Sequence, residues 1–211
     1  MFPAVGIAHA RIAAPSIPVF RLMAFSSVKQ LLLPCLLLPC MLLISGCTSR
    51  VSDIPLVNAG FEEAGDARNP VPGWRLTQHA GAPAYDMSID TETAAAGRAS
   101  FRMRRLTPQF FGEIAQQVAI PEGRGGRSAI LSARMKTRDV GRKGWVLVMT
   151  IVAATGNSQV RAEPQSGTHE FTEVSIHAKL PDDARAIEVS ALLLDEGTAW
   201  LDDVHLLIAV D

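Results

Sequence analysis

The sequence contains little cysteine and few aromatic side chains. Of its 211 residues only three are cysteines, and all three precede residue 48. The rest of the chain therefore cannot form a disulfide or a thiolate metal site, so a hydrophobic core must stabilise it. Phe, Trp and Tyr together make up 6% of the residues, which limits the number of rings that could be exposed to bind a ligand.

The chain also lacks a charge excess and any recognisable catalytic motif. Its net charge is −1, which argues against nucleic acid as a partner. It contains no Gly-x-Ser-x-Gly elbow, phosphate-binding loop or dinucleotide fingerprint. His169 and His177 on one strand would lie about 26 Å apart, too far to share zinc. Neighbouring acids, as in Asp182–Asp183 and Asp202–Asp203, face opposite sides of a strand. These absences predict that the protein is not an enzyme.

One long apolar run is present near the N-terminus. Lys29 precedes the run Leu31–Ile44, and small residues follow it, a pattern typical of a secretory signal peptide. The run is shorter than the roughly 20 residues that span a bilayer, and it contains Pro34 and Pro39. We predict a signal peptide over residues 1–46. Residues 1–22 are interpreted as an over-extended start or a loose n-region, because Met23 would begin a signal of ordinary length.

The tetrad Ile44–Cys47 resembles the lipobox of bacterial lipoproteins. This resemblance implies lipidation of Cys47, a polar lipidated tether over residues 47–55, and a lipid-anchored location in the cell envelope. Thr48 follows the cysteine where an aspartate would favour the inner membrane. In a Gram-negative host we therefore expect the outer membrane, on its periplasmic or surface side. The alternative is an ordinary signal peptide or a short anchor helix.

Residues 56–211 show short apolar segments separated by clusters of Gly, Pro, Asn and Asp. Such spacing predicts strands and turns. In 129–137, apolar and polar residues alternate, as they do in a strand with one buried face. The predicted strands are Ser100–Arg105, Glu113–Ile120, Ala129–Thr137, Trp145–Ala153, Phe171–Leu180, Ala186–Leu194 and Ala199–Ile208. Their number and spacing predict an all-β fold, an antiparallel β-sandwich.

Eight short motifs follow one another across this region. They are Leu56–Glu62, Pro72–Trp74, Gly97–Met103, Ile114–Val118, Leu131–Thr137, Gly167–Thr168, Pro181–Ala184 and Gly197–Val204. Their order resembles the family 4/9 carbohydrate-binding modules of the CenC type. The resemblance implies a galactose-binding-like jelly roll and a glycan ligand, although this fold serves many binding tasks.

The resemblance further implies a structural Ca²⁺ held by Glu62 and Asp202 with backbone carbonyls, because calcium prefers oxygen ligands. Strand alternation places Asp202 on one face with Trp200 and Val204, which are interpreted as core residues, and a carboxylate there needs compensation. The alternative is that backbone amides satisfy both carboxylates.

Four residues are candidates for ligand contact. Trp145 follows a glycine-flanked turn and is placed at a rim, Tyr85 lies in a loop-like stretch, and Arg134 is on the polar face of its strand. Gln116 interrupts an apolar strand, so it needs a partner, either a ligand hydroxyl or loop backbone. For the others the alternative is packing or solvation. Trp74 is interpreted as structural.

These patterns together predict a non-catalytic binding lipoprotein of the cell envelope with a glycan as its ligand. The alternative is a structural or scaffolding lipoprotein that binds an envelope protein.

Overall fold

The computed structural model describes residues 50–210. The predicted signal peptide and Cys47 lie outside these residues. Within them the chain forms ten strands and no helix. The strands are β1 (Val51–Asp53), β2 (Arg75–Gln78), β3 (Tyr85–Asp90), β4 (Ser100–Arg105), β5 (Gly112–Ala119), β6 (Ser128–Ala153), β7 (Ser158–Arg161), β8 (Gln165–Lys179), β9 (Ala184–Leu193) and β10 (Thr198–Ala209). Hence no helix in this part of the chain could span a membrane.

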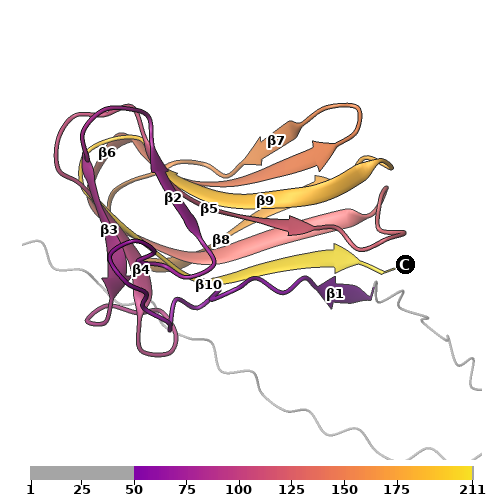
Figure 1. The fold of residues 1–211 in the computed structure, drawn as a ribbon, viewed down its shortest axis with the longest axis horizontal. Coiled ribbons are helices and arrows are strands. Elements are labelled where there is room, and N and C mark those ends of the chain that lie inside the picture. Colours follow the sequence, from indigo (N-terminus) through magenta and orange to yellow (C-terminus); the bar gives the residue numbers. More distant parts are fainter. Residues whose placement is uncertain (1–49, 211) are drawn as a thin grey trace, which may run out of the picture. The chain divides into compact units, whose positions relative to one another are not determined.

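All strand pairs are antiparallel, and the long strand β6 belongs to both layers of a sandwich. Its first half pairs with β10 and β8, and its second half pairs with β9 and β7. One layer therefore has the order β3-β4-β10-β6-β8, and the other has the order β2-β5-β9-β6-β7. Figure 1 shows β5 and β9 lying over β10. The predicted antiparallel jelly-roll sandwich is confirmed.

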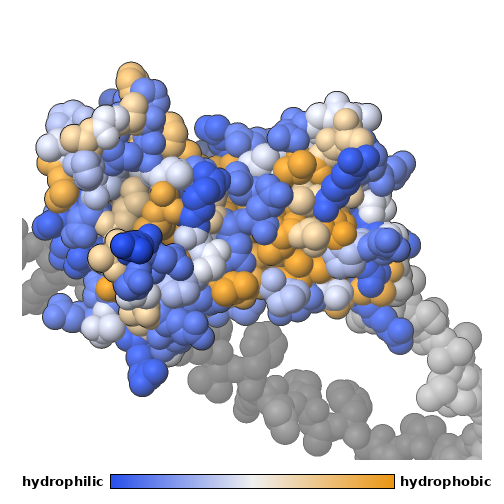
Figure 2. All heavy atoms as spheres, in the orientation of Figure 1, coloured by the Kyte–Doolittle hydropathy of each residue, from blue (hydrophilic) through white to orange (hydrophobic). Residues whose placement is uncertain are grey.

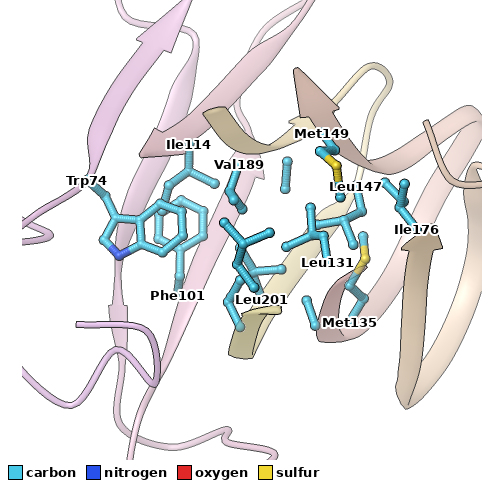
Figure 3. Close-up of a cluster of buried hydrophobic side chains, with 14 of the residues drawn as sticks. Trp74, Phe101, Ile114, Leu131, Met135, Leu147, Met149, Ile176, Val189 and Leu201 are labelled. Atoms are coloured by element: carbon cyan, nitrogen blue, oxygen red, sulfur yellow. The ribbon is translucent and has the colours of Figure 1, made fainter. Parts of the chain in front are cut away.

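The core lies between the two layers and is filled from every second position of their strands. Leu131 and Met135 on the first half of β6 face Leu147 and Met149 on its second half, and all four are buried (Figure 3). Trp74 packs at one end of this core against Phe61, with ring centroids 5.2 Å apart. The structural role predicted for Trp74 is therefore consistent with its 5% exposure.

Two predicted strands are joined. The segments 129–137 and 145–153 form one strand, because the turn expected at 141–144 is a bend inside β6, where the register with β8 shifts. Gly144 has a φ of +82° in this bend, which glycine adopts without strain. Strand β3 was not predicted. Tyr85 is its first residue, so the prediction that Tyr85 lies in a loop is wrong.

The domain begins earlier than predicted. Val51–Asp53, expected to lie in the tether, pairs with the end of β10, where Val51 is opposite Ala209. Ile54 is buried with 5% exposure. The first strand thus starts four residues after Cys47, and the boundary expected at residue 56 is corrected to residue 51.

Candidate functional site

The two aromatic residues proposed as exposed platforms are buried. Trp145 is 0% exposed, and its indole Nε1 donates to the Trp200 carbonyl at 3.2 Å. Tyr85 is 7% exposed, and its hydroxyl donates to the Leu193 carbonyl at 3.2 Å. Tyr85 forms part of the wall of a shallow pocket beside Thr77, but so little exposed surface cannot stack a sugar ring. Both placements were wrong, because the turn before Trp145 is a strand bend and Tyr85 begins the edge strand β3 with its side chain buried.

Gln116 makes the backbone contacts given as its alternative. Its Oε1 accepts from the Val57 amide at 2.8 Å, and its Nε2 donates to the carbonyls of Val57 and Gly73 at 3.0 and 2.9 Å. It therefore fastens two loops to β5 and presents little to a ligand. Arg134 lies on the outer face of β6, half-buried and opposite Glu173 of β8. Its Nη2 donates to the Phe171 carbonyl at 3.5 Å, and the Phe171 ring is only partly exposed.

Glu62 and Asp202 both bind the backbone of the loop 91–99. Asp202 Oδ2 accepts from the amides of Ala95 and Ala96 at 2.7 and 3.0 Å, while Glu62 Oε1 accepts from those of Arg98 and Ala99 at 2.8 and 3.3 Å. The Arg98 contact lowers the pKa of Glu62 most, whereas burial raises the pKa of Asp202.

These contacts bear on the predicted calcium site. One oxygen of each carboxylate faces N–H donors, and within residues 50–210 no group of three or more acidic, His or Cys side chains could hold a metal. Because calcium requires six to eight oxygen ligands, this donor set fits the amide interpretation better. Calcium binding itself stays a prediction.

Asp202 does not point into the core. The register of β10 shifts between Asp202 and His205, and Asp203 has a φ of +49°. This bulge places Val204 in the core while Trp200 and Asp202 lie on the outer face, so the shared face predicted for all three is wrong. A bulge adds one residue and reverses the alternation beyond it.

The outer faces of both layers have polar groups that already pair with one another. On the β2-β5-β9 face, Arg75 contacts Glu188 at 2.8 Å and Thr77 donates to Glu113 at 3.0 Å. On the other face, Trp200 is only 3% exposed. Lys136 and Arg138 lie 5.7 and 5.2 Å from the centroid of its ring. The Phe171 ring on this face is partly exposed, and Lys136 also lies 5.9 Å from its centroid.

An exposed aromatic ring lies instead at the loop end where β4 finishes and β5 begins. Phe110 is 70% exposed, the highest fraction among the exposed large hydrophobic side chains of the described residues, which are Val51, Val57, Leu106 and Phe110. Hydrophobic residues on the face shown in Figure 2 form patches divided by hydrophilic ones. Phe110 lines a pocket of about 280 Å³ with Arg105, Pro108, Gln109 and Lys143. We call this the Phe110 pocket.

A second pocket of about 230 Å³ adjoins it. The two share Arg105 and Pro108, and the second adds Leu106, Thr107, Asp195 and Glu196. The combined surface therefore draws on two loops, at residues 106–111 and 194–197, and on the bend of β6 at residues 141–144. Such a cluster of connecting segments on a rigid sandwich is a frequent position for binding sites.

Hydrogen bonds hold the Phe110 ring in place although it is exposed. Gln109 Nε2 donates to the Ala80 carbonyl at 2.6 Å, and the His79 amide donates to the Phe111 carbonyl at 3.1 Å. The His79 ring then packs edge-on to Phe110 with 4.8 Å between centroids. A platform that is already ordered loses less conformational entropy when a ligand binds.

Phe110 was not among the predicted ligand contacts, because the predicted platforms were chosen from Trp and Tyr residues only. A usable signal was present: Phe110 and Phe111 are adjacent in a loop that begins with Pro108 and ends at Gly112. Loops run over the protein surface, so aromatic residues in such a segment are candidates for exposure. Gly112 permits the close packing beneath, since a Cβ there would lie 2.8 Å from the Tyr85 ring.

No protein-family model matches the chain, and no curated protein matches it. Solved structures do match. A cyclase from Fischerella sp. TAU, in complex with 4-(1H-indol-3-yl)butan-2-one, is 12% identical with a TM-score of 0.51, covering 76% of this chain and 99% of the cyclase. The enzymatically active domain of bacteriophage CBA120 tailspike protein 4 is 15% identical with a TM-score of 0.51 and covers 64% of this chain, which spans 19% of the tailspike.

Carbohydrate-binding modules are also among the matches. TmCBM61, in complex with β-1,4-galactotriose, is 18% identical with a TM-score of 0.48, covering 71% of this chain and 94% of the module. Identities this low show a shared β-sandwich fold and nothing more specific. Because the matches include catalytic domains as well as binding modules, the function has to be argued from the site.

Proposed function

We propose that the protein is a non-catalytic lipoprotein of the cell envelope that binds glycans at the Phe110 pocket. The observation that carries this proposal is the exposed Phe110 ring, which is held by His79 and Gln109 at the edge of a pocket with polar and charged walls. Sugars present an apolar ring face together with hydroxyl groups. An aromatic ring can pack against the first, while amide, guanidinium and ammonium groups bind the second.

The size of the pocket supports recognition of a short stretch of glycan. Its volume of about 280 Å³ lies just below the range for ligand pockets, about 300–1,000 Å³. We therefore expect one or two sugar residues to be bound here, at a chain end or a branch. Solved sandwich domains with similar folds include a module in complex with β-1,4-galactotriose and a xylan-binding domain, which makes glycans a reasonable first class of ligand to screen.

The position of the pocket suits a protein anchored at Cys47. Asp195 and Glu196, which line the second pocket beside the Phe110 pocket, lie just before β10 begins at Thr198, whereas β1 pairs with the opposite end of that strand. Twelve residues of strand place the two ends about 36–40 Å apart. A lipid on Cys47, four residues before Val51, could lie no more than about 14 Å from β1. An anchored domain would thus hold the pocket away from the membrane.

A glycan array tests the proposed function. The domain comprising residues 48–211 is suitable because all ten strands and the core lie within it. We expect wild type to retain at least one glycan, and Phe110→Ala to lose at least tenfold in affinity for it. Phe171→Ala is the matched control, because it removes a partly exposed phenyl ring from β8, outside the pocket. Retention of no glycan at all would contradict the proposal, and capture of an envelope protein instead would favour the scaffolding alternative.

Metabolic labelling with a clickable fatty acid tests the anchor. We expect label in the wild-type full-length chain and none in Cys47→Ser. Equal labelling of the two proteins would contradict lipidation at Cys47.

A further inference from the structure

The walls of the Phe110 pocket carry charges of one sign. Of its five lining residues, Arg105 and Lys143 are cationic and none is acidic. This is unexpected in a chain whose acidic and basic residues nearly balance. A ligand that enters the pocket beside Phe110 therefore meets two cationic side chains in its lining.

The charge of Arg105 is already opposed by a neighbour. Its Nη1 lies 3.5 Å from Asp195 Oδ1. The Lys143 and Glu196 amides donate to Asp195 at 3.2 and 3.0 Å, and these bonds lower the pKa of its carboxyl group. Asp195 therefore stays ionised and neutralises Arg105. Arg105 and Asp195 thus form a fixed ion pair at one side of the pocket, and the net charge of this pair is close to zero.

The ammonium group of Lys143 remains available to pair with a ligand. Its side chain is exposed, and among residues 50–210 its ammonium group makes no ion pair or hydrogen bond. Its backbone is nevertheless fixed, because the Lys143 amide donates to Asp195. The next residue, Gly144, packs closely against Pro164, since a Cβ on Gly144 would lie 2.5 Å from it. The result is an unpaired cation on a rigid bend at the rim of the pocket.

We propose that the Phe110 pocket selects acidic glycans, with a uronic acid residue packed against the Phe110 ring and its carboxylate held by Lys143. This inference rests on the glycan-binding function proposed above and names the class of sugar. An ammonium group paired with a carboxylate forms a charge-assisted hydrogen bond, and an uncharged sugar cannot supply that contact. Gln109 and Pro108, which also line the pocket, would contact the rest of the sugar ring.

Polyuronates and their neutral forms provide a direct test. Polygalacturonate, alginate and hyaluronan would each be compared with the same polymer after carboxyl reduction, using affinity electrophoresis of residues 48–211. We expect at least one polyuronate to bind at least tenfold more tightly than its reduced form at low salt. The preference should shrink as salt rises, because salt screens exposed charges.

Two matched variants separate selectivity from binding. Lys143→Gln should lose the preference and bind both forms equally, whereas Arg142→Gln, which removes the adjacent exposed cation outside the pocket lining, should keep it. Phe110→Ala should lose binding to both the polyuronates and their carboxyl-reduced forms.

The failures of the two proposals are distinguishable. Equal binding of acidic and neutral polymers by wild type, with Lys143→Gln unchanged, would overturn the acidic preference and leave glycan binding intact. Binding of polyuronates that neither Lys143→Gln nor Phe110→Ala weakens would place the site elsewhere and overturn the inference. Absence of binding to every acidic and neutral glycan would overturn both.

Discussion

Two groups of aromatic rings in this protein have similar spacing and opposite exposure. Phe61 lies 5.2 Å from Trp74 and 5.9 Å from Phe101, and all three are at most 5% exposed. His79 lies 4.8 Å from Phe110, which is 70% exposed. The first group packs between the layers of the sandwich, whereas hydrogen bonds between loops hold the second. Burial therefore fixes one group for stability, and backbone contacts fix the other while leaving it accessible.

The largest effect that would sharpen this comparison concerns Trp74. Trp74→Ala removes a buried indole and should destabilise the domain by about 3–5 kcal/mol through lost transfer energy and the cavity left behind. Phe110→Ala should change the free energy of unfolding by no more than about 0.5 kcal/mol, as exposed substitutions usually do. Urea denaturation of both variants measures this difference. Equal destabilisation would mean that Phe110 is a packing residue.

The next effect concerns the loop 91–99, which two carboxylates hold. If Glu62 and Asp202 bind Ca²⁺ as predicted, a hundredfold excess of calcium over its Kd should stabilise the native state by about 2.7 kcal/mol. Asp202→Ala should abolish that response. Thermal melting with calcium and with a chelator checks it. Coincident curves would contradict the calcium site and leave the backbone amides as the partners of both carboxylates.

A smaller effect distinguishes the charge of Asp202 from its hydrogen bonds. Asp202→Ala removes the acceptor of the Ala95 and Ala96 amides, whose hydrogen bonds are partly buried, and this should cost about 1–3 kcal/mol. Asp202→Asn keeps an acceptor and removes the charge, so it should cost less. A control at Glu173, an exposed carboxylate of β8, should show little change when converted to Gln.

The pH dependence has a definite sign. Burial raises the pKa of Asp202 above its ordinary value of 3.8, so the folded state holds this proton more tightly than the unfolded state. Its contribution to stability is therefore complete below about pH 4 and declines as pH rises through the folded pKa. Relative to wild type, Asp202→Asn should become more stable from pH 4 towards neutrality. A constant difference across this range would contradict the assignment.

The sequence predicted the sandwich well because strand alternation and turn residues are local signals. The segment 100–105 was predicted with the same ends that β4 has. The prediction failed where contacts between distant parts of the chain determine the local structure. A bulge at Asp203 reverses the alternation in β10, and a bend carries β6 through a glycine-rich segment that locally resembles a turn.

The candidate site was harder to predict for a related reason. Exposure of a ring depends on which segments meet at one end of the sandwich. Phe110 packs against His79 and lines a pocket with Lys143, and these residues are far apart in the chain. The choice of Trp145 and Tyr85 followed residue type, although both lie on strands whose inner face is buried. Only the folded structure shows which aromatic rings are buried and which are exposed.

Mapping of the bound glycan by NMR tests the central claim most directly. The 15N-labelled domain would be titrated with an oligosaccharide of the best retained glycan. We predict that amide shift changes concentrate in residues 79–80, 106–111, 141–144 and 195–196. Shift changes confined to the outer face of β5, β9 and β6, around Gln117, Glu188 and Thr150, would contradict the Phe110 pocket as the binding site.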